Sequence, residues 1–350
     1  MRISGLIPFS GARLDLLLDS LRSLVNQSMP PEEIVVVLNG PDVGAGEEIS
    51  KWKEFHHRLV VLDAGEPGSV ARALNTGARA ASGEFLVRLD AGDISCPDRV
   101  EAQMREAERT VADVVYSDIE IRAARNRLVR LRGAVPNEQT ASHLLVSNCI
   151  PHPSVLLRRS SLLSAGAYSE QCAIEDYELW LRMAAKWRFS SVQRPLVRYL
   201  YTPNSQTRKI RTLTPPDLIT SLCSAWKTVA GIELPAFVAE VLLAPLSIKR
   251  LASPERREVY LSASDALAQL VDLKKGQATK EVRGLRQRVA VTMLELVAAA
   301  PRETARPFIR WLTVTPPRMS AVVGKVALQA AVLKVQRNRA PAFGETAGHP

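Results

Sequence analysis

The chain has 350 residues, 46% of them apolar and 5% aromatic, which excludes a wholly disordered protein and allows one catalytic domain with a smaller appendage. Its four cysteines form no CxxC pair, which excludes a zinc ribbon and a dense disulfide framework and fits a reducing compartment. The formal net charge of +10 is unevenly spread, because residues 1–200 carry 24 Lys and Arg against 25 Asp and Glu, whereas residues 201–350 carry 22 against 11.

Strands and helices are predicted to alternate from the first residues. The expected strands are Ile3–Phe9, Glu33–Leu38, Leu59–Leu62 and Phe85–Leu89, and the helices between them are Leu14–Val25, a polar helix with Ile49 and Trp52, and Ser69–Ala81. Apolar residues recur at helical spacing in the helices, and turn residues such as Asn39-Gly40-Pro41 separate the segments. This order is typical of an α/β domain with a mainly parallel sheet.

The alternation continues as far as Tyr201. Pro97 is expected as the first residue of a helix, followed by a strand at Asp113–Ile121, a helix at Thr140–Val146, a strand at Ser154–Arg158 and a helix at Glu175–Trp187. A linker is then predicted at Thr212–Pro216. We therefore expect a catalytic domain over residues 1–212 and a basic helical region over residues 213–350, with a helix at Arg318–Arg339 and a disordered final ten residues.

Two acids follow the strand Phe85–Leu89. Asp90 and Asp93 are placed at its carboxyl end, where open α/β sheets bind ligands. Paired carboxylates can hold a divalent cation such as Mg²⁺ or Mn²⁺ and leave positions open for a diphosphate. A solvated cap is the alternative, because acidic turns after strands are common.

A second acidic pair begins the helix Glu175–Trp187. The helix dipole stabilises an anion in the first turn, so Asp176 is predicted to be a charged carboxylate available as a base. Plain helix capping is the alternative.

Several short motifs occur in a specific order. They are Ile7-Pro8-Phe9-Ser10, Asn75-Thr76-Gly77, Asp90-Ala91-Gly92-Asp93, His152-Pro153-Ser154 and Glu175-Asp176-Tyr177-Glu178-Leu179-Trp180-Leu181-Arg182. In this order and spacing, residues 3–203 resemble the inverting family 2 glycosyltransferases with the GT-A fold. The resemblance implies a Rossmann-like sheet flanked by helices and transfer of a sugar from a nucleotide-diphosphate sugar, expected to be a UDP-sugar, with a divalent cation. The acceptor it implies is a hydroxyl of a lipid-linked or surface polysaccharide.

The resemblance also implies roles for individual residues. Donor binding falls to Pro8, Phe9, Ser10, Asn39, Arg72, Asn75 and Asp90, of which Phe9, Ser10 and Asn39 line the base pocket and Arg72 approaches the phosphates. Asp90 faces the ribose or the metal. Asp176 matches the catalytic base, with Glu175 beside it.

Three positions depart from the family pattern. Gly92 stands where the second acid of the metal turn is usual, so Asp93 and His152 are expected to complete the metal site with Asp90. Ser10 replaces an Asn after the first strand. The second strand ends in Asn39-Gly40 instead of an acidic pair.

Other functions stay open at this point. Gly92 and Ser10 would also suit a catalytically weak or inactive nucleotide-sugar-binding protein on the same fold. A nucleotidyltransferase would use acids and metal in a similar sheet, but this function leaves Glu175 and Asp176 without a role. A nucleoside triphosphate site also usually shows a Gly-rich basic loop early in the chain, and this sequence has none.

The basic C-terminal region motivates an expectation about location. No stretch resembles a signal peptide or offers about 18 uninterrupted apolar residues, so we expect a cytoplasmic protein. Its basic helices are expected to meet the anionic inner face of the membrane, and a merely solvated basic face is the alternative. Nucleic acid is not expected as a partner, because aromatic residues are not interleaved with the basic ones.

Overall fold

The computed structural model describes residues 1–10, 13–40, 47–49, 59–65, 68–123, 127–132, 134–201, 214–244, 253–272, 289 and 292–293. The chain divides into two compact units, Met1–Ala244 and Pro245–Pro350. The first contains the sheet, and α11 (Ser253–Asp272) belongs to the second. Trp52 of the expected polar helix and the expected helix Arg318–Arg339 lie outside the described residues.

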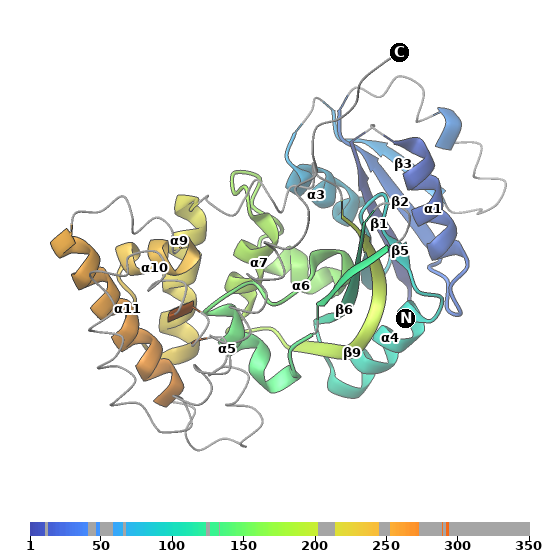
Figure 1. The fold of residues 1–350 in the computed structure, drawn as a ribbon. Helices are drawn as coiled ribbons and strands as arrows, with labels where there is room; N and C mark the ends of the chain where they lie inside the picture. Colours follow the sequence, from blue (N-terminus) through green and yellow to red (C-terminus); the bar gives the residue numbers. More distant parts are fainter. Residues whose placement is uncertain are drawn as a thin grey trace, which may run out of the picture. The chain divides into compact units, whose positions relative to one another are not determined.

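The first unit is an α/β domain (Figure 1). Its strands are β1 (Ile3–Phe9), β2 (Glu33–Leu38), β3 (Leu59–Asp63), β4 (Phe85–Arg88), β5 (Ile94–Ser95), β6 (Val114–Ala123), β7 (Arg127–Arg132), β8 (Leu156–Arg158) and β9 (Phe189–Leu200). Its α-helices are α1 (Leu14–Val25), α3 (Val70–Ala80), α4 (Arg99–Thr110), α5 (Thr140–Leu144), α6 (Arg159–Ser164), α7 (Glu175–Met183), α9 (Pro216–Ala225) and α10 (Ala236–Leu243), with short turns η3 (Asn137–Gln139), η4 (His152–Ser154) and the π-helix η6 (Trp226–Ala230). No helix in the described parts of the chain is both long and apolar enough to span a membrane.

The strands form one mixed sheet in the order β3-β2-β1-β4-β8-β6-β9-β5, with β7 paired to β6. The half β3-β2-β1-β4 is parallel, β6 and β9 are also parallel to each other, and β8 runs antiparallel to β4 and β6. The carboxyl ends of β1, β2 and β4 therefore meet at one edge, which carries Ser10, Asn39 and Asp90.

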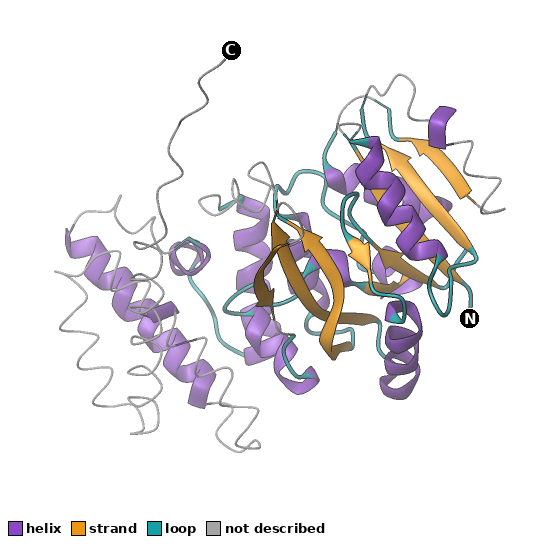
Figure 2. Ribbon diagram, turned by 45° about the vertical axis from the view of Figure 1, so that its right-hand side comes forward, coloured by secondary structure: helices purple, strands orange, loops and turns teal. Residues whose placement is uncertain are grey.

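Helices cover both faces of the sheet (Figures 1 and 2). The core on one face joins Ile7 of β1 to Leu21 of α1 and Met104 of α4. On the other face α3 lies so close to the sheet that a Cβ on Gly77 would meet the side chain of Leu6 at 2.3 Å. Successive side chains of β1 thus pack alternately against the helices on the two faces of the sheet.

Three strands were not expected from the sequence: β5, β7 and β9. The strand β9 is the longest of the sheet, with 12 residues. Its pairing with β6 shifts register beside Asp118, which pairs with Pro195. Arg194 and Pro195 interrupt the apolar alternation at this point, which removes the periodic signal of a strand.

The first compact unit continues past the linker expected at Thr212–Pro216. The Nε1–H of Trp226, a fully buried side chain, donates to the carbonyl of Leu145 at 2.8 Å. The hydroxyl of Ser221 on α9 donates to Glu178 on α7 at 2.8 Å. Helices α9 and α10 are therefore part of this unit, and the assignment of catalysis to residues 1–212 stays a prediction.

Candidate active site

The turn after β4 is held by a serine of α1. The Ser20 hydroxyl accepts the N–H of Gly92 at 2.9 Å and donates to the carbonyl of Asp93 at 2.7 Å. Gly92 has φ +102°, a backbone conformation that residues other than glycine rarely adopt. The turn thus requires glycine where the family commonly has an acid, and this accounts for the missing carboxylate.

Asp90 forms an ion pair with a buried arginine that was not predicted as a site residue. The Arg88 guanidinium contacts both Asp90 oxygens, at 2.5 and 2.7 Å, and its side chain is 5% exposed, against 36% for Asp90. Burial opposes the Arg88 cation, yet the nearby Asp90 carboxylate leaves the pKa of Arg88 above its ordinary value. Arg88 thus supplies a fixed positive charge under Asp90. A charged residue inside the apolar strand β4 was the available sequence signal.

Asp93 points into the protein. One of its carboxylate oxygens accepts the N–H of Leu200 at the end of β9, at 2.9 Å, and the side chain is buried. Burial, together with the neighbouring Asp90 charge, raises the pKa of Asp93 well above its usual value. Asp93 therefore ties the turn to β9.

His152 of η4 lies between Tyr168 and the start of α7. Its Nε2 lies 3.1 Å from the hydroxyl of Tyr168, and its Nδ1 lies 3.8 Å from an oxygen of Glu175. Burial and the nearby Arg88 cation lower the pKa of His152 well below its usual value, so the ring is neutral near pH 7.

Tyr168 follows directly after a turn with two positive φ angles. Gly166 and Ala167 both have positive φ, +87° and +60°, and Arg182 of α7 donates to the carbonyls of Ala165 and Ala167. No sequence pattern marked Tyr168, because its place depends on this turn.

The two acids at the start of α7 lie near Asp90. Burial and then the Asp176 charge raise the pKa of Glu175, the Arg88 charge lowers it, and the Asp90 charge adds a smaller increase. Tyr168 contacts His152, which in turn lies 3.8 Å from Glu175. Burial raises the pKa of Tyr168 overall, although the charge of Arg88, which pairs with Asp90, acts to lower it. The Asp90 charge thus acts on Glu175 at the start of α7. That the acids near position 90 and those at 175 and 176 form one site stays a prediction.

Asp176 is held by two donors. Its Oδ1 accepts the N–H of Tyr177 at 2.7 Å, and its Oδ2 accepts the amide of Asn148 at 3.0 Å. The half-exposed carboxylate stands in the first turn of α7, where the helix dipole favours negative charge.

Glu175 makes stability depend on pH. Burial, followed by the Asp176 charge, raises the pKa of Glu175 from 4.5 to about 7, so the folded state keeps a proton that the unfolded state releases between these values. Stability is therefore lost as pH rises through this window, and Glu175→Gln removes the effect. The stability of the variant relative to wild type should rise by about 2–3 kcal/mol from about pH 5 to about pH 8, in urea unfolding. Glu108→Gln, on an exposed residue, should show no such change with pH, and an equal change in both variants would contradict the assignment.

The predicted donor-binding residues of β1 and β2 differ in accessibility. Ser10 is exposed at the strand end and Pro8 is half-buried, whereas the ring of Phe9 is 4% exposed and lies in the core. The Asn39 amide donates to the carbonyl of Gly68 at 3.0 Å and accepts its N–H at 3.1 Å, which fixes the loop before α3. Their role in base recognition stays a prediction.

The two predicted donor-binding residues of α3 contact the segment 168–170. Arg72 pairs with Glu170 at 3.6 Å, and Asn75 donates to the carbonyl of Tyr168 at 2.9 Å while accepting its N–H at 3.0 Å. Asn75 thus fixes the backbone of Tyr168. Contact of either residue with a donor stays a prediction.

The residues expected to bind a metal do not form a joint ligand set. Asp93 faces Leu200, His152 faces Tyr168, and the Asp90 carboxylate is paired with Arg88. Within the described residues, no group of three or more His, Cys, Asp and Glu side chains could hold a metal ion. As placed here, Asp90, Asp93 and His152 therefore do not fit one metal ion as a set of ligands. Asp90 is the solvent-accessible member of the three.

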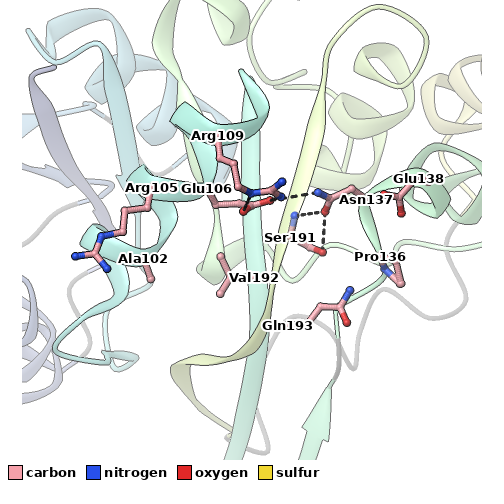
Figure 3. A pocket seen from close by; sticks show the side chains of 10 residues that line it. All are labelled: Ala102, Arg105, Glu106, Arg109, Pro136, Asn137, Glu138, Ser191, Val192 and Gln193. Atoms are coloured by element: carbon pink, nitrogen blue, oxygen red, sulfur yellow. Dashed lines mark hydrogen bonds and ion pairs between the residues drawn. The ribbon is translucent and has the colours of Figure 1, made fainter.

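A cavity of about 470 Å³ lies elsewhere, between α4, η3 and β9 (Figure 3). Its lining residues are Ala102, Arg105, Glu106, Arg109, Pro136, Asn137, Glu138, Ser191, Val192 and Gln193, and none of them is a predicted site residue. Arg109 pairs with Glu106 at 2.7 Å, and Asn137 donates to the same carboxylate at 3.2 Å. The cavity is therefore lined by groups that largely satisfy one another.

Comparison with known proteins identifies the class. The model of the family described as glycosyl transferase family 2 matches residues 6–163. The amylovoran biosynthesis glycosyltransferase AmsE of Erwinia amylovora is 29% identical over 168 residues, 47% of this chain and 62% of that protein. The O-antigen biosynthesis glycosyltransferase WbnJ of Escherichia coli is 26% identical over 172 residues, 47% of this chain and 65% of that protein.

A solved structure supports the same fold. S. aureus TarS 1–349 in complex with UDP-GlcNAc has a TM-score of 0.55 and 15% identity, covering 88% of this chain and 92% of that one. The sheet and its flanking helices have the fold of a GT-A glycosyltransferase domain. Residues 6–163 belong to glycosyl transferase family 2. The aligned region spans less than two thirds of AmsE and of WbnJ.

Proposed function

We propose that this chain is an inverting glycosyltransferase that moves a sugar from a nucleotide-diphosphate sugar to a hydroxyl of a polysaccharide or lipid-linked glycan. The electrostatic influence of Asp90 on Glu175, and the contact of Glu175 with His152 at 3.8 Å, support this proposal most directly. A UDP-sugar is the proposed donor, since TarS, with the same fold, was solved with UDP-GlcNAc. The polysaccharide acceptor is proposed from the names of AmsE and WbnJ.

The reaction proposed is a single displacement. Asp176 takes the proton of the acceptor hydroxyl as its oxygen forms a bond to the anomeric carbon. The bond from that carbon to the diphosphate breaks on the opposite side, the electron pair leaves with the nucleoside diphosphate, and the configuration inverts. Asp90 would hold a divalent cation together with the donor phosphates, since Mg²⁺ commonly binds one or two carboxylates plus substrate phosphates, and the cation would neutralise the diphosphate charge.

A donor screen tests the proposal. The purified chain is mixed with UDP-glucose, UDP-galactose, UDP-GlcNAc or GDP-mannose and Mg²⁺ or Mn²⁺, and the released nucleoside diphosphate is measured. Release from at least one donor is expected, and release from none would contradict the proposed function. Binding without turnover would favour the inactive binding protein instead.

We further propose that the second unit meets an anionic membrane surface. Residues 245–350 carry 18 Lys and Arg against 8 Asp and Glu, whereas residues 1–244 carry 28 of each, so the whole net charge lies in the second unit. Basic residues near an anionic surface contribute about 1 kcal/mol each. The full chain should sediment with vesicles containing anionic lipid at low salt, and a chain ending at Ala244 should not. Equal sedimentation with neutral vesicles would contradict this proposal.

A further inference from the structure

We propose that Asn148 is a positioning residue that holds the Asp176 carboxylate in the orientation for proton transfer, an inference that rests on the base role proposed above. The Asn148 Nδ2 donates to Asp176 Oδ2 at 3.0 Å, and its Oδ1 accepts the N–H of Ile150 at 3.1 Å. The Asn148 side chain thus links the segment before η4 to the start of α7.

The two oxygens of Asp176 are held by different parts of the chain. Oδ1 accepts the N–H of Tyr177, which belongs to the helix itself, while Oδ2 accepts the amide of Asn148 from 28 residues earlier. The terminal torsion of an aspartate is broad and easily turned, so a donor from outside the helix restricts the plane of the carboxylate more than the Tyr177 N–H does by itself. The second donor fixes that plane relative to the segment before η4.

The segment that carries Asn148 is itself anchored from two sides. The hydroxyl of Tyr177 donates to the carbonyl of Leu144 at 2.6 Å, and Trp226 donates to the carbonyl of Leu145 at 2.8 Å. Tyr177 and Trp226 are both buried. The base is therefore oriented by a segment that the helices after residue 212 help to hold in place.

Two substitutions separate orientation of the base from support of the backbone. Asn148→Asp keeps the oxygen that accepts the N–H of Ile150, but it places a carboxylate against Asp176 where an amide donated. Asn148→Ala removes both bonds. Asn137→Asp is the matched control, because Asn137 also donates to a carboxylate, that of Glu106, in the cavity beside α4 (Figure 3).

The test measures turnover and donor KM for the full chain and these variants, as nucleoside diphosphate released from UDP-glucose, UDP-galactose, UDP-GlcNAc or GDP-mannose, with water or an added sugar as acceptor. Misplacement of a catalytic group by about 1 Å can cost about 100-fold, so both Asn148 variants should lower kcat about 10- to 100-fold with donor KM within about twofold. Asn137→Asp should match wild type. Melting temperatures report folding, and if Asn148→Ala unfolds, Asn148→Asp decides alone.

The outcomes distinguish this inference from the proposed function. An active wild type matched in kcat by both folded Asn148 variants would overturn the inference alone, as would a loss confined to donor KM. A wild type that releases no nucleoside diphosphate from any donor would overturn the proposed function and the inference with it.

Discussion

Asp176→Asn is expected to lower turnover about 100- to 10,000-fold, because a general base typically contributes this much and an amide cannot take the acceptor proton. The substitution keeps the size of the side chain, and its oxygen can still accept a bond at the start of α7. Donor affinity should therefore stay close to wild type. Nucleoside diphosphate release and calorimetric donor binding, measured on the same protein, give the two quantities separately.

The matched control is Asp217→Asn, the same chemical change in the first turn of α9, on an exposed residue. Its turnover should equal wild type. Turnover of Asp176→Asn within about twofold of wild type would exclude Asp176 as the base, because loss of a general base lowers turnover about 100-fold or more.

Trp226→Ala is expected to destabilise the first unit by about 3–5 kcal/mol. The Trp226 side chain is fully buried, so its truncation loses the free energy of burying the ring and leaves a destabilising cavity. The carbonyl of Leu145 also loses its donor, which adds about 1 kcal/mol. Urea unfolding followed by far-UV circular dichroism measures the loss.

Two further variants separate the causes. Trp226→Phe keeps most of the apolar area and loses only the N–H, so about 1–2 kcal/mol should be lost. Phe237→Ala on α10 removes an aromatic that is 45% exposed, and about 0.5 kcal/mol or less is expected. A Trp226→Ala protein as stable as Phe237→Ala would contradict the packing of η6 against the segment after α5.

The first half of the fold could be predicted from the sequence. The bounds of β1, α1 and β2 agree with the expected segments, because each is a short apolar or periodic run between clear breaks. The strand β9 could not be predicted, since Arg194 and Pro195 break its pattern and its pairing with β6 depends on residues about 75 positions earlier. Local sequence carries no record of such pairing.

The candidate site shows the same division. The positions of Asp90 and Asp176 could be predicted because each stands at the end or start of an element, in a motif with a recognisable order. Arg88, Tyr168 and Asn148 could not, because their roles come from contacts between segments that meet only in the folded chain. The expected metal ligands Asp90, Asp93 and His152 do not lie together as one set for a similar reason, since the sequence does not reveal that Asp93 is buried against β9.

The charge distribution differs between the two units of the chain. Residues 1–244 are electrically balanced, and their acids and arginines pair locally around the site. The excess of positive charge lies in residues 245–350. We therefore expect donor chemistry and attachment to an anionic surface to be separable, with vesicle binding lost and nucleoside diphosphate release retained in a chain that ends at Ala244.

The central claim is that the acids at Asp90 and Asp176 serve one bound sugar nucleotide. A crystal structure of the chain with UDP-GlcNAc tests it most directly. The diphosphate is expected beside Asp90, with the anomeric carbon facing Asp176. A nucleotide bound instead in the cavity beside α4, or one that leaves Asp176 without contact to the sugar, would contradict it.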